Sequence, residues 1–441
     1  MKKKKSFNEK KTFDELFPIC RSITGNGYRK SFNIINKFIP FKKYRYPTGK
    51  KVFDWKVPYE WNVKTAYVKN LKGKKLIDFS KNNLHLMSYS TPINKVMPLS
   101  KLNKNLYSIP NLPKYIPYVT SYYKKNWGFC LSHNKRLKLK NENYKVFIDS
   151  SLKKGNVEWG EYLLKKTTND NSIKKDTILI TSYLCHPSMA NNELSGPLIQ
   201  ILIFLKLKRL KKRRFNYLFV LNPETIGSIC FIHKNLDYLK QNLISGIVLT
   251  CLGGPEKKLS YKLSRNGNSL LDKHFSDMAK SNKIKIRKFD TEGSDERQYC
   301  SSECDLPVGQ LARTIYAQHK EYHTSADDKK FVKLNTFKKT ANEIFKCFLD
   351  NEKKIFLRRK QPFCEIQLGK RNLYPNINSP LTWKNSSDKV LNSRNQLDII
   401  NTILSYADGI TSLSEIEFSK NYRYKDKKKI YMKLKKKGIL F

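Results

Sequence analysis

The sequence has little that would place it in a membrane or in an oxidising compartment. Its most apolar helix-like run, residues 198–207, is far shorter than the roughly 20 residues that cross a bilayer. The basic N-terminus is followed by no apolar stretch that would complete a signal peptide. Nine cysteines are scattered without a Cys-x-x-Cys pair, which argues against a disulfide framework and a cysteine-rich zinc site. We therefore expect a cytoplasmic protein with no membrane span and with reduced thiols.

Acidic residues are also scarce, because 37 Asp and Glu oppose 87 Lys and Arg and leave a formal net charge of +50. Basic surfaces attract polyanions, so a nucleic-acid partner is one interpretation of this charge. However, lysine is spread over the whole chain together with Asn, Ile, Phe and Tyr, the mixture that an AT-rich genome gives to any enzyme. The even spread favours a compositional origin, and a nucleic-acid partner stays open but is not favoured.

The 441 residues, 39% of them hydrophobic, suffice for several domains. Apolar strands predicted at 177–184, 217–221 and 246–250 alternate with helices, which is typical of an α/β fold with a mostly parallel sheet flanked by helices. Short alternating segments rich in Tyr, Trp, Val and Pro predict a small inserted β domain. We expect four parts: a discontinuous α/β domain over 1–51 and 151–356, the inserted β-rich domain over 52–150, a linker over 357–389, and a winged-helix domain over 390–441.

Polar clusters follow the predicted strands, at the edge of an α/β sheet where sites usually lie. The clusters hold these candidate residues: His186, Asn192 and Glu193 after the first strand, Glu224 after the second, Asp295, Glu296 and Arg297 ahead of a later strand, and Tyr322 and His323 after the last. Each cluster alone has a simpler interpretation, because Asn192, Glu193 and Glu224 are also residues that favour the start of a helix. Together the clusters predict one site.

Four motifs make the sequence similar to a known family: Cys-His-Pro-Ser-Met-Ala-Asn-Asn-Glu-Leu-Ser-Gly from Cys185, Pro-Glu-Thr-Ile-Gly-Ser from Pro223, Gly-Ser-Asp-Glu-Arg-Gln-Tyr from Gly293, and Glu-Tyr-His-Thr-Ser from Glu321. The sequence resembles the zinc-dependent aminopeptidases and, more closely, a bacterial aminopeptidase-like family found with polysaccharide-biosynthesis genes. The likeness extends over nearly the whole chain, including the Tyr118-Val-Thr-Ser-Tyr-Tyr segment, the inserted β domain and a C-terminal winged helix. It implies a zinc-peptidase-like sheet.

The resemblance also implies roles for the candidate residues. His186 and His323 match metal-binding histidines, Glu224 matches a general base, and Asn192 stands where related enzymes have an aspartate that bridges two zinc ions. Thr225 and Thr250 fall where further carboxylates would bind metal, so we expect one zinc ion, held by His186, His323 and Asn192. Asp295, Glu193, Glu296, Arg297 and Tyr322 would then support these ligands or bind substrate, and Glu193 is an alternative ligand if the loop shifts.

Two functions remain open at this point. The first is zinc-dependent hydrolysis of an amide bond in a small peptide or another amide-bearing substrate, with a link to surface polysaccharide biosynthesis. The second is a catalytically inactive peptidase domain that binds a ligand or nucleic acid as a regulator, which the missing carboxylates favour. We further expect that the winged helix or the inserted domain forms a homo-oligomer, and that the lysine-rich tail offers mostly phosphate contacts to DNA.

Overall fold

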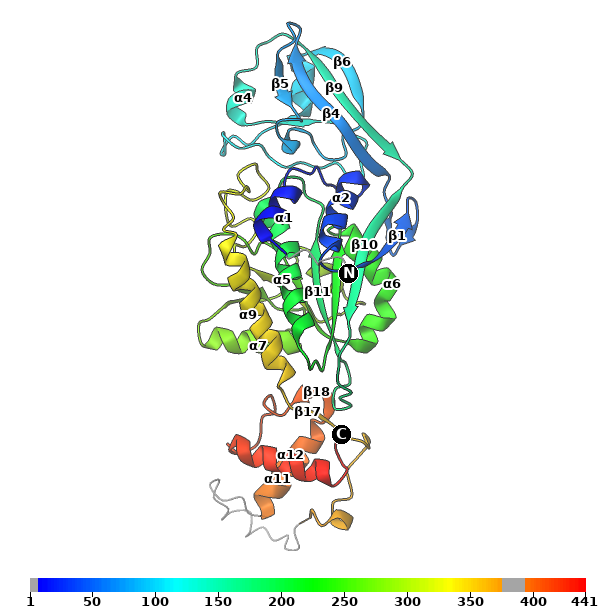
Figure 1. Ribbon diagram of the computed structural model, residues 1–441, viewed down its shortest axis with the longest axis vertical. Coiled ribbons are helices and arrows are strands. Elements are labelled where there is room, and N and C mark those ends of the chain that lie inside the picture. Colours follow the sequence, from blue (N-terminus) through cyan, green and yellow to red (C-terminus); the bar gives the residue numbers. More distant parts are fainter. Residues whose placement is uncertain (1–6, 375–392) are drawn as a thin grey trace, which may run out of the picture.

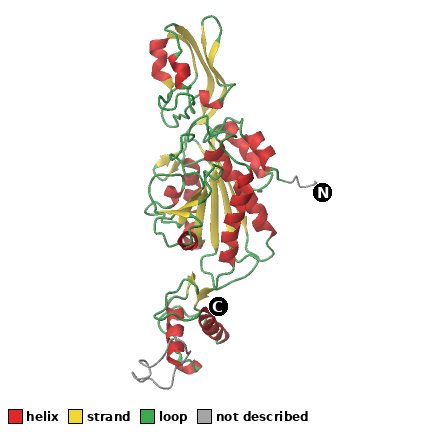
Figure 2. Cartoon of the chain, turned by 90° about the vertical axis from the view of Figure 1, so that its left-hand side faces the viewer, coloured by secondary structure: helices red, strands yellow, loops and turns green. Residues whose placement is uncertain are grey.

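The computed structural model describes residues 7–374 and 393–441. The molecule is elongated, and three parts follow one another along its long axis (Figure 1). A four-stranded sheet lies at one end, a large α/β domain in the middle and a small helical domain at the other end. Figure 2, turned by 90°, shows the same order. The chain enters the first part from the second and returns to it, so the middle domain is discontinuous in sequence.

An eight-stranded sheet forms the middle of the α/β domain, in the order β1-β10-β12-β11-β13-β16-β14-β15. Its strands are β1 (Lys42–Pro47), β10 (Asn156–Leu164), β11 (Thr177–Tyr183), β12 (Asn216–Asn222), β13 (Leu243–Leu249), β14 (Ser260–Lys262), β15 (Lys285–Arg287) and β16 (Val308–Ala312). The four central strands β12, β11, β13 and β16 run parallel, whereas β10 and β14 pair antiparallel with their edges. The predicted mostly parallel α/β sheet is therefore confirmed.

Helices cover both faces of this sheet, which explains why its central strands are apolar throughout. In β11, Ile178 and Ile180 pack into one core while Leu179 and Tyr183 pack into the other. The first core is covered by α1 (Glu9–Leu16), α2 (Gly25–Asn36), α5 (Ser195–Arg209), α7 (Leu270–Lys280) and α9 (Asn335–Glu352). The second core is covered by α6 (Ile226–Asn242) and α8 (Glu296–Tyr299). Both faces of the sheet are thus withdrawn from water.

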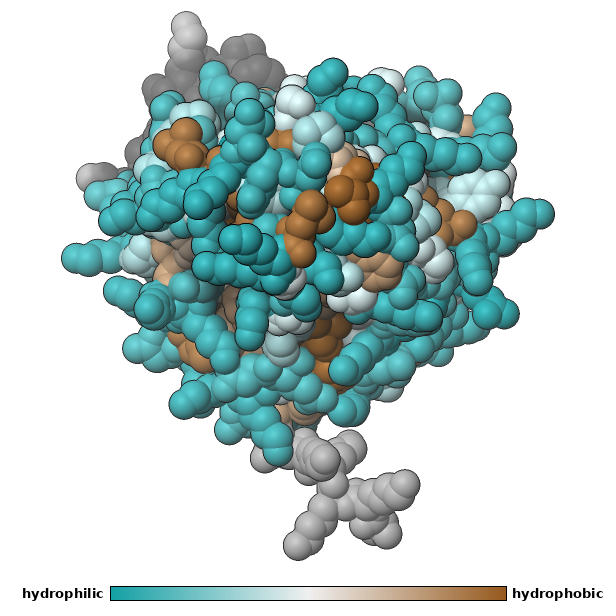
Figure 3. Space-filling model, turned by 90° about the horizontal axis from the view of Figure 1, so that it is seen from above, coloured by the Kyte–Doolittle hydropathy of each residue, from teal (hydrophilic) through white to brown (hydrophobic). Residues whose placement is uncertain are grey.

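The inserted residues build a separate sheet in the order β5-β4-β9-β6. Its long strands β4 (Glu60–Asn70) and β9 (Asn143–Lys153) pair antiparallel, flanked by β5 (Lys75–Asp78) and β6 (Ile93–Pro98). Short elements complete this part: β2 (Lys51–Val52), β3 (Trp55–Lys56), β7 (Leu106–Tyr107), β8 (Phe129–Cys130), α3 (Leu99–Leu102), α4 (His133–Leu137) and the 3-10 turns Asn83–His85 and Asn103–Asn105. Figure 3 looks onto this end, where hydrophilic side chains predominate and several hydrophobic side chains are also exposed.

The C-terminal domain contains α11 (Ser393–Ser405), β18 (Asp408–Ser412) and α12 (Tyr424–Lys436). It also takes in β17 (Phe356–Arg358), which pairs antiparallel with β18, and the 3-10 turn Gly369–Arg371. Leu357, Ile366, Leu368 and Leu373 belong to the apolar core of this domain. The linker predicted over 357–389 is therefore wrong for its described residues, 357–374, because their widely spaced apolar side chains carry no periodic pattern. Residues 375–389 of that prediction lie outside the described residues.

The parallel strands bring distant residues to one edge of the sheet. The carboxyl ends of β11, β12, β13 and β16 meet there, and candidate residues follow β11, β12 and β16. We therefore look for the functional site at this edge of the sheet.

Within 7–374 and 393–441, no helix has the length and apolar character that crossing a lipid bilayer requires.

Candidate functional site

A pocket of about 390 Å³ opens at the carboxyl edge of the central strands. His186, Glu224, Arg297 and His323 are among the residues that line it. Trp55 and the 118–123 segment of the inserted part complete the lining through aromatic rings: Tyr118, Tyr122 and Tyr123. The sequence-predicted residues His186, Glu224, Arg297 and His323 thus face one cavity, although they come from four different segments.

A buried carboxylate fixes the orientation of the His186 ring. Glu193 Oε2 lies 2.9 Å from His186 Nδ1 and also accepts the backbone N–H groups of Cys185 and His186. Its other oxygen accepts a hydrogen bond from the Arg21 guanidinium at 3.0 Å, and both side chains are fully inaccessible to solvent. With Nδ1 engaged, Nε2 of His186 is the nitrogen that is turned to Glu224. A carboxylate on one imidazole nitrogen is the usual device that orients a metal-binding histidine.

Glu193 itself is not available as an alternative metal ligand, since both of its oxygens are engaged. Cys185, His186 and Glu193 are the only described group of three whose ligand atoms approach within 4.8 Å of one another. Burial raises the pKa of the Cys185 thiol well above its usual range, so the thiolate that binds metals is disfavoured. This group therefore supports the His186 ring and is not itself a metal centre.

Glu224 is positioned as a base within the pocket. Its Oε2 lies 3.6 Å from His186 Nε2, and its Oε1 accepts a hydrogen bond from the Ser294 hydroxyl at 2.6 Å. The side chain is about one quarter exposed, on the pocket side. Burial raises the pKa of Glu224 above its usual value, although the neighbouring His186 acts in the opposite direction. A carboxylate with a raised pKa both takes up and returns a proton near neutral pH.

Asp295 holds the turn that carries Glu224. Its oxygens accept hydrogen bonds from the Asn222 amide at 2.9 Å, the Thr225 backbone N–H at 2.7 Å and the Ser228 hydroxyl at 3.0 Å. Thr225 has a φ of +63°, a backbone conformation that a β-branched residue adopts only when its surroundings impose it. Burial raises the pKa of Asp295 to about 7. The Asp295 side chain is completely buried, so the structure does not bring it to the pocket as an anchor for a substrate amine.

Asn192 and His323 lie together on the other side of His186. The Asn192 Nδ2 atom is 2.8 Å from His323 Nε2, while the Asn192 carbonyl oxygen accepts a hydrogen bond from the Tyr183 hydroxyl. The centres of the His186 and His323 rings are 5.3 Å apart. Burial lowers the pKa of His323 to about 3, which keeps this imidazole neutral. Tyr322 stacks on the His323 ring with centroids 3.9 Å apart and supports it.

These side chains fit one divalent metal ion but not two. Two imidazole nitrogens and one amide oxygen supply the roughly three protein ligands of a catalytic zinc ion. A half-turn of the Asn192 amide would present its oxygen to the cavity beside His323, and the Tyr183 hydroxyl, which also contacts Thr250 Oγ1, can accept the amide N–H in exchange. A second ion would need further carboxylates, and Thr225 and Thr250 are threonines.

Glu296 lies away from the pocket. Its side chain forms an ion pair at 2.7 Å with Lys262, and both side chains are inaccessible to solvent. It also accepts a hydrogen bond from Gln310 at 3.0 Å. Glu296 therefore braces the 292–296 segment, whereas the next residue, Arg297, reaches the pocket.

Two features of the site have no strong signal in the sequence. Tyr118 packs against both histidine rings, with centroids 5.1 Å from His186 and 5.2 Å from His323, and its hydroxyl contacts that of Tyr122 at 2.7 Å. Asp327 accepts the backbone N–H groups of Asn191 and Asn192. The first contact depends on where the inserted part meets the sheet, and the second joins residues that are 135 and 136 positions apart. Spacing along the chain predicts neither.

Comparison with known proteins places the chain in a family. A family model described as "Domain of unknown function (DUF4910)" matches residues 10–353. The chain belongs to this family. A second model, described as a winged helix-turn-helix, matches residues 355–441, in agreement with the inclusion of β17 in that domain. The predicted C-terminal winged helix is thus confirmed, with an earlier start.

Two similar proteins come from Clostridium acetobutylicum, and one of them is a solved structure that covers nearly the whole chain. A Clostridium acetobutylicum protein with the provisional name of a polysaccharide biosynthesis protein with an aminopeptidase-like domain is 45% identical over 366 residues, 82% of this chain and 81% of the relative. A crystal structure of a protein from the same organism, provisionally described as a peptidase, is 38% identical and covers 98% of this chain and 95% of its own, with a TM-score of 0.76. The predicted aminopeptidase-like resemblance is confirmed.

More distant structures share the fold alone. BSAP, a zinc aminopeptidase from Bacillus subtilis, has a TM-score of 0.53 at 11% identity and covers 79% of this chain and 96% of its own. A peptidase M28 precursor from Shewanella amazonensis has the same TM-score and identity and covers 80% and 94%. The family therefore carries the fold of zinc aminopeptidases.

Proposed function

We propose that this protein hydrolyses an amide bond in the His186–Glu224 pocket. The observation that carries the proposal is the placement of the Glu224 carboxylate 3.6 Å from His186 Nε2, with its other oxygen oriented by Ser294. The aminopeptidase-like fold supports the same reaction class. A carboxylate oriented by a hydroxyl and facing an imidazole within a cavity is the arrangement that a general base needs.

The roles of the residues follow from their contacts. His186 and His323 line the cavity and Asn192 contacts His323 Nε2, so these three side chains would hold one zinc ion once the Asn192 amide turns its oxygen to the cavity. A bound zinc ion polarises a carbonyl group and lowers the pKa of a water molecule. Glu224 takes the proton of the attacking water and returns it to the leaving amine. Ser294 keeps the carboxylate directed to the cavity, and Glu193 keeps Nε2 of His186 in place.

The substrate is proposed only as a class. The pocket is lined by the aromatic rings of Trp55, Tyr118, Tyr122 and Tyr123, with Arg297 as a cation. This lining suits a small peptide or another small amide with an apolar or ring-shaped part next to the scissile bond. We further propose a substrate from surface polysaccharide biosynthesis, on the support of the relative that bears this name.

Two measurements on the purified chain test the proposal. Metal analysis after dialysis is expected to give one zinc ion per chain, with a loss of most of the metal in His186→Ala. A panel of aminoacyl p-nitroanilides and N-acylated hexosamines is expected to include at least one compound that is hydrolysed. Glu224→Gln keeps the size of the side chain and removes the base, so it should lower that rate by about 10²–10⁴-fold.

Glu417→Gln, the same change at an exposed residue of the C-terminal domain, is the control and should leave the rate unchanged. A wild-type chain without bound metal, or a hydrolysis rate that Glu224→Gln leaves unaltered, would contradict the proposal. Such a result would favour the other function, in which the pocket of an inactive peptidase domain binds a ligand.

A further inference from the structure

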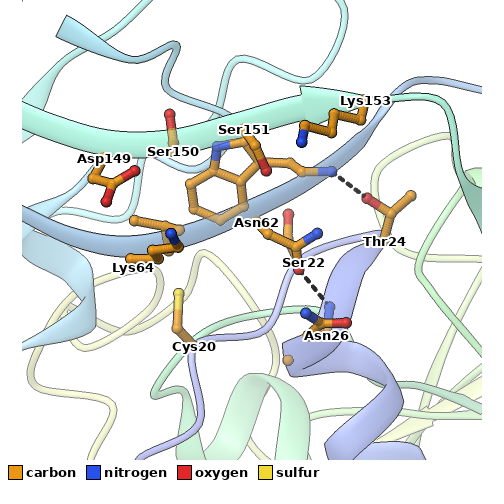
Figure 4. A pocket seen from close by; sticks show the side chains of 13 residues that line it. Cys20, Ser22, Thr24, Asn26, Asn62, Lys64, Asp149, Ser150, Ser151 and Lys153 are labelled. Carbon is orange, nitrogen blue, oxygen red and sulfur yellow. Dashed lines mark hydrogen bonds between the residues drawn. The ribbon is translucent and has the colours of Figure 1, made fainter.

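The inserted sheet and the N-terminal segment face each other across a second, larger cavity of about 570 Å³. Strands β4 and β9 form one side of it, and the segment 20–27, which ends in the first turn of α2, forms the other (Figure 4). Two hydrogen bonds join the sides: Asn62 Oδ1 accepts the Asn26 N–H at 2.7 Å, and Thr24 Oγ1 accepts the Trp61 N–H at 3.1 Å. Polar contacts beside a cavity thus hold the inserted sheet to this segment.

The segment Cys20–Thr24 separates this cavity from the His186–Glu224 pocket. Three of its side chains line the larger cavity: Cys20, Ser22 and Thr24. Ile23 lines the pocket instead, and Arg21 binds Glu193 behind it. The two cavities therefore share one thin wall. The inserted part reaches the pocket beyond this wall, with Trp55 and the segment 118–123.

The loop that carries His323 has no regular structure of its own. It joins β16 to α9, and its described residues 313–334 contain neither a helix nor a strand. His323 itself has a φ of +51°, a left-handed conformation that a residue other than glycine keeps mainly where its surroundings impose it. Contacts with other segments are therefore needed to fix the position of the His323 ring.

The backbone of the inserted part pairs with this loop on both sides of Thr324, which takes part in an isolated antiparallel bridge. On one side, the Tyr118 N–H donates a hydrogen bond to the carbonyl oxygen of His323 at 2.8 Å. On the other side, the Ser325 N–H donates to the carbonyl oxygen of Ile116 at 2.8 Å, and the Ile116 N–H donates to Ser325 Oγ at 3.0 Å. The segment 116–118 thus holds the residues that flank Thr324.

Aromatic rings continue this contact from His323 into the inserted sheet. The Tyr118 ring packs against both histidines of the pocket, and its hydroxyl contacts that of Tyr122 at 2.7 Å. The Tyr122 ring meets the Tyr89 ring edge-on, with centroids 5.3 Å apart, and Tyr89 stacks on Trp61 of β4 at 5.8 Å. Tyr89 and Trp61 are buried. A line of packed rings therefore joins the inserted sheet to the two histidines.

We propose that the inserted part positions His323 for metal binding through its segment 116–118, and that Tyr118 is a positioning residue of the site. The proposal rests on the proposed function in that His323 and His186 hold one zinc ion. The backbone hydrogen bonds keep His323 in its left-handed conformation. The Tyr118 ring stands at 88° to the His323 ring, with centroids 5.2 Å apart, and limits rotation of the imidazole. The metal affinity of the α/β domain then depends on a contact with the inserted part.

The zinc affinity of the full chain, measured by competition with a chelator of known affinity, tests the proposal. Tyr118→Ala removes the ring, so we expect zinc to bind about 10- to 100-fold more weakly, the usual effect of losing a residue that supports a metal ligand. Tyr118→Phe keeps the ring and should bind zinc as the wild type does. Tyr67→Ala is the matched control, because it removes a ring of β4 that packs on Phe147 outside the pocket, and it should leave the affinity unchanged.

A second measurement, NMR of the metal-free chain labelled with ¹³C at the histidine rings, reports the position of His323 directly. Loss of one signal in His323→Gln identifies the signal of this ring. We expect Tyr118→Ala to move that signal toward the position of free histidine, because the ring current of residue 118 is lost, and Tyr118→Phe to leave it in place. Ser325→Ala removes the acceptor of the Ile116 N–H and should both shift the signal and weaken zinc binding.

The wild-type zinc affinity and the wild-type His323 signal in both Tyr118→Ala and Ser325→Ala would overturn the proposal. An equal loss of affinity in Tyr67→Ala would do the same, since it would show a general loss of stability. The NMR measurement needs neither zinc nor a substrate. A chain that binds no zinc would therefore contradict the proposed hydrolysis, whereas the His323 signal alone decides whether the inserted part positions this residue.

Discussion

At the scale of single residues, the buried pair of Arg21 and Glu193 is the clearest link between stability and the site. The Arg21 guanidinium is the only Lys or Arg side chain within hydrogen-bond distance of Glu193 among the described residues, and it also contacts the carbonyl oxygens of Leu16 and His186. Glu193 in turn orients the His186 ring. A buried carboxylate that loses its partner keeps the cost of desolvation without compensation.

Arg21→Met is therefore expected to lower the free energy of unfolding by about 3–5 kcal/mol. Urea denaturation followed by circular dichroism measures this change. Lys280→Met removes the exposed partner of Asp277 and serves as the control, with no measurable effect expected. Equal stability of Arg21→Met and the wild type would contradict the assignment of Arg21 as the counter-ion of Glu193.

The metal affinity depends on a second residue, Asn192. Its amide offers a neutral oxygen where a carboxylate would attract a dication more strongly. Asn192→Asp is thus expected to tighten zinc binding by at least about 10-fold, since each charged ligand adds Coulomb attraction in a buried site. Competition with a chelator of known affinity measures the change, and an unchanged or weaker affinity would show that Asn192 is not a ligand.

At the scale of elements, helix α5 approaches the sheet very closely at its first turn. A π-helical turn, Ala190–Leu194, precedes it and contains Asn192 with a non-helical backbone. A methyl group on Gly196 would overlap the Ser182 hydroxyl and the carbonyl oxygen of Leu249, in the neighbouring strand β13. The absence of a side chain at this position lets the helix hold Asn192 and Glu193 against the carboxyl edge of the sheet.

Gly196→Ala is expected to force α5 away from the sheet and to lower the free energy of unfolding by about 1–3 kcal/mol, the usual cost of overpacking. It should also weaken zinc binding, because Asn192 moves with the helix. Gly369→Ala is a matched control, since nothing lies within 4 Å of the added carbon there. Equal free energies of unfolding of the two variants would show that the close packing of α5 against the sheet does not contribute to stability.

The sequence predicts the long elements of the fold better than the short ones. Strands β11, β12 and β13 are continuous apolar runs between helices, so their pattern alone indicates a buried parallel sheet. Strands β14 and β17 have three residues each, too few for any period to be visible. His186 and Glu224 follow predicted strands, and the structure places both at one pocket, whereas the burial of Asp295 depends on the packing of Asn222 and Ser228 around it.

At the scale of the whole molecule, the winged-helix domain presents a basic helix at one end of the long axis (Figure 1). In α12 and the residue after it, Leu434 and Ile430 face the core while these lysines are wholly or partly exposed: Lys425, Lys427, Lys428, Lys429, Lys433, Lys435, Lys436 and Lys437. Lysine contacts phosphates as a point charge and carries little information about base sequence.

We expect the full chain to bind duplex DNA without sequence preference and only at low salt. Fluorescence anisotropy with two unrelated duplexes should give equal affinities at about 50 mM salt and a loss of about 10³-fold or more by about 200 mM, if six or more phosphates are contacted. Lys428→Glu/Lys435→Glu should weaken this binding further. A preference for one duplex that persists at about 200 mM salt would instead indicate specific recognition.

The thin segment between the two cavities also restricts how the protein can evolve. Side chains 20, 22 and 24 line one cavity, side chain 23 lines the other, and Arg21 binds Glu193 behind that second cavity. Deletion or insertion of a single residue here would turn each following side chain toward the opposite side of the segment, as a one-residue shift does in a strand. Natural variants should therefore differ by substitution but keep the length of this segment, and a substitution scan should show an alternating pattern in which changes at positions 21 and 23 lower hydrolysis more than changes at positions 20, 22 and 24.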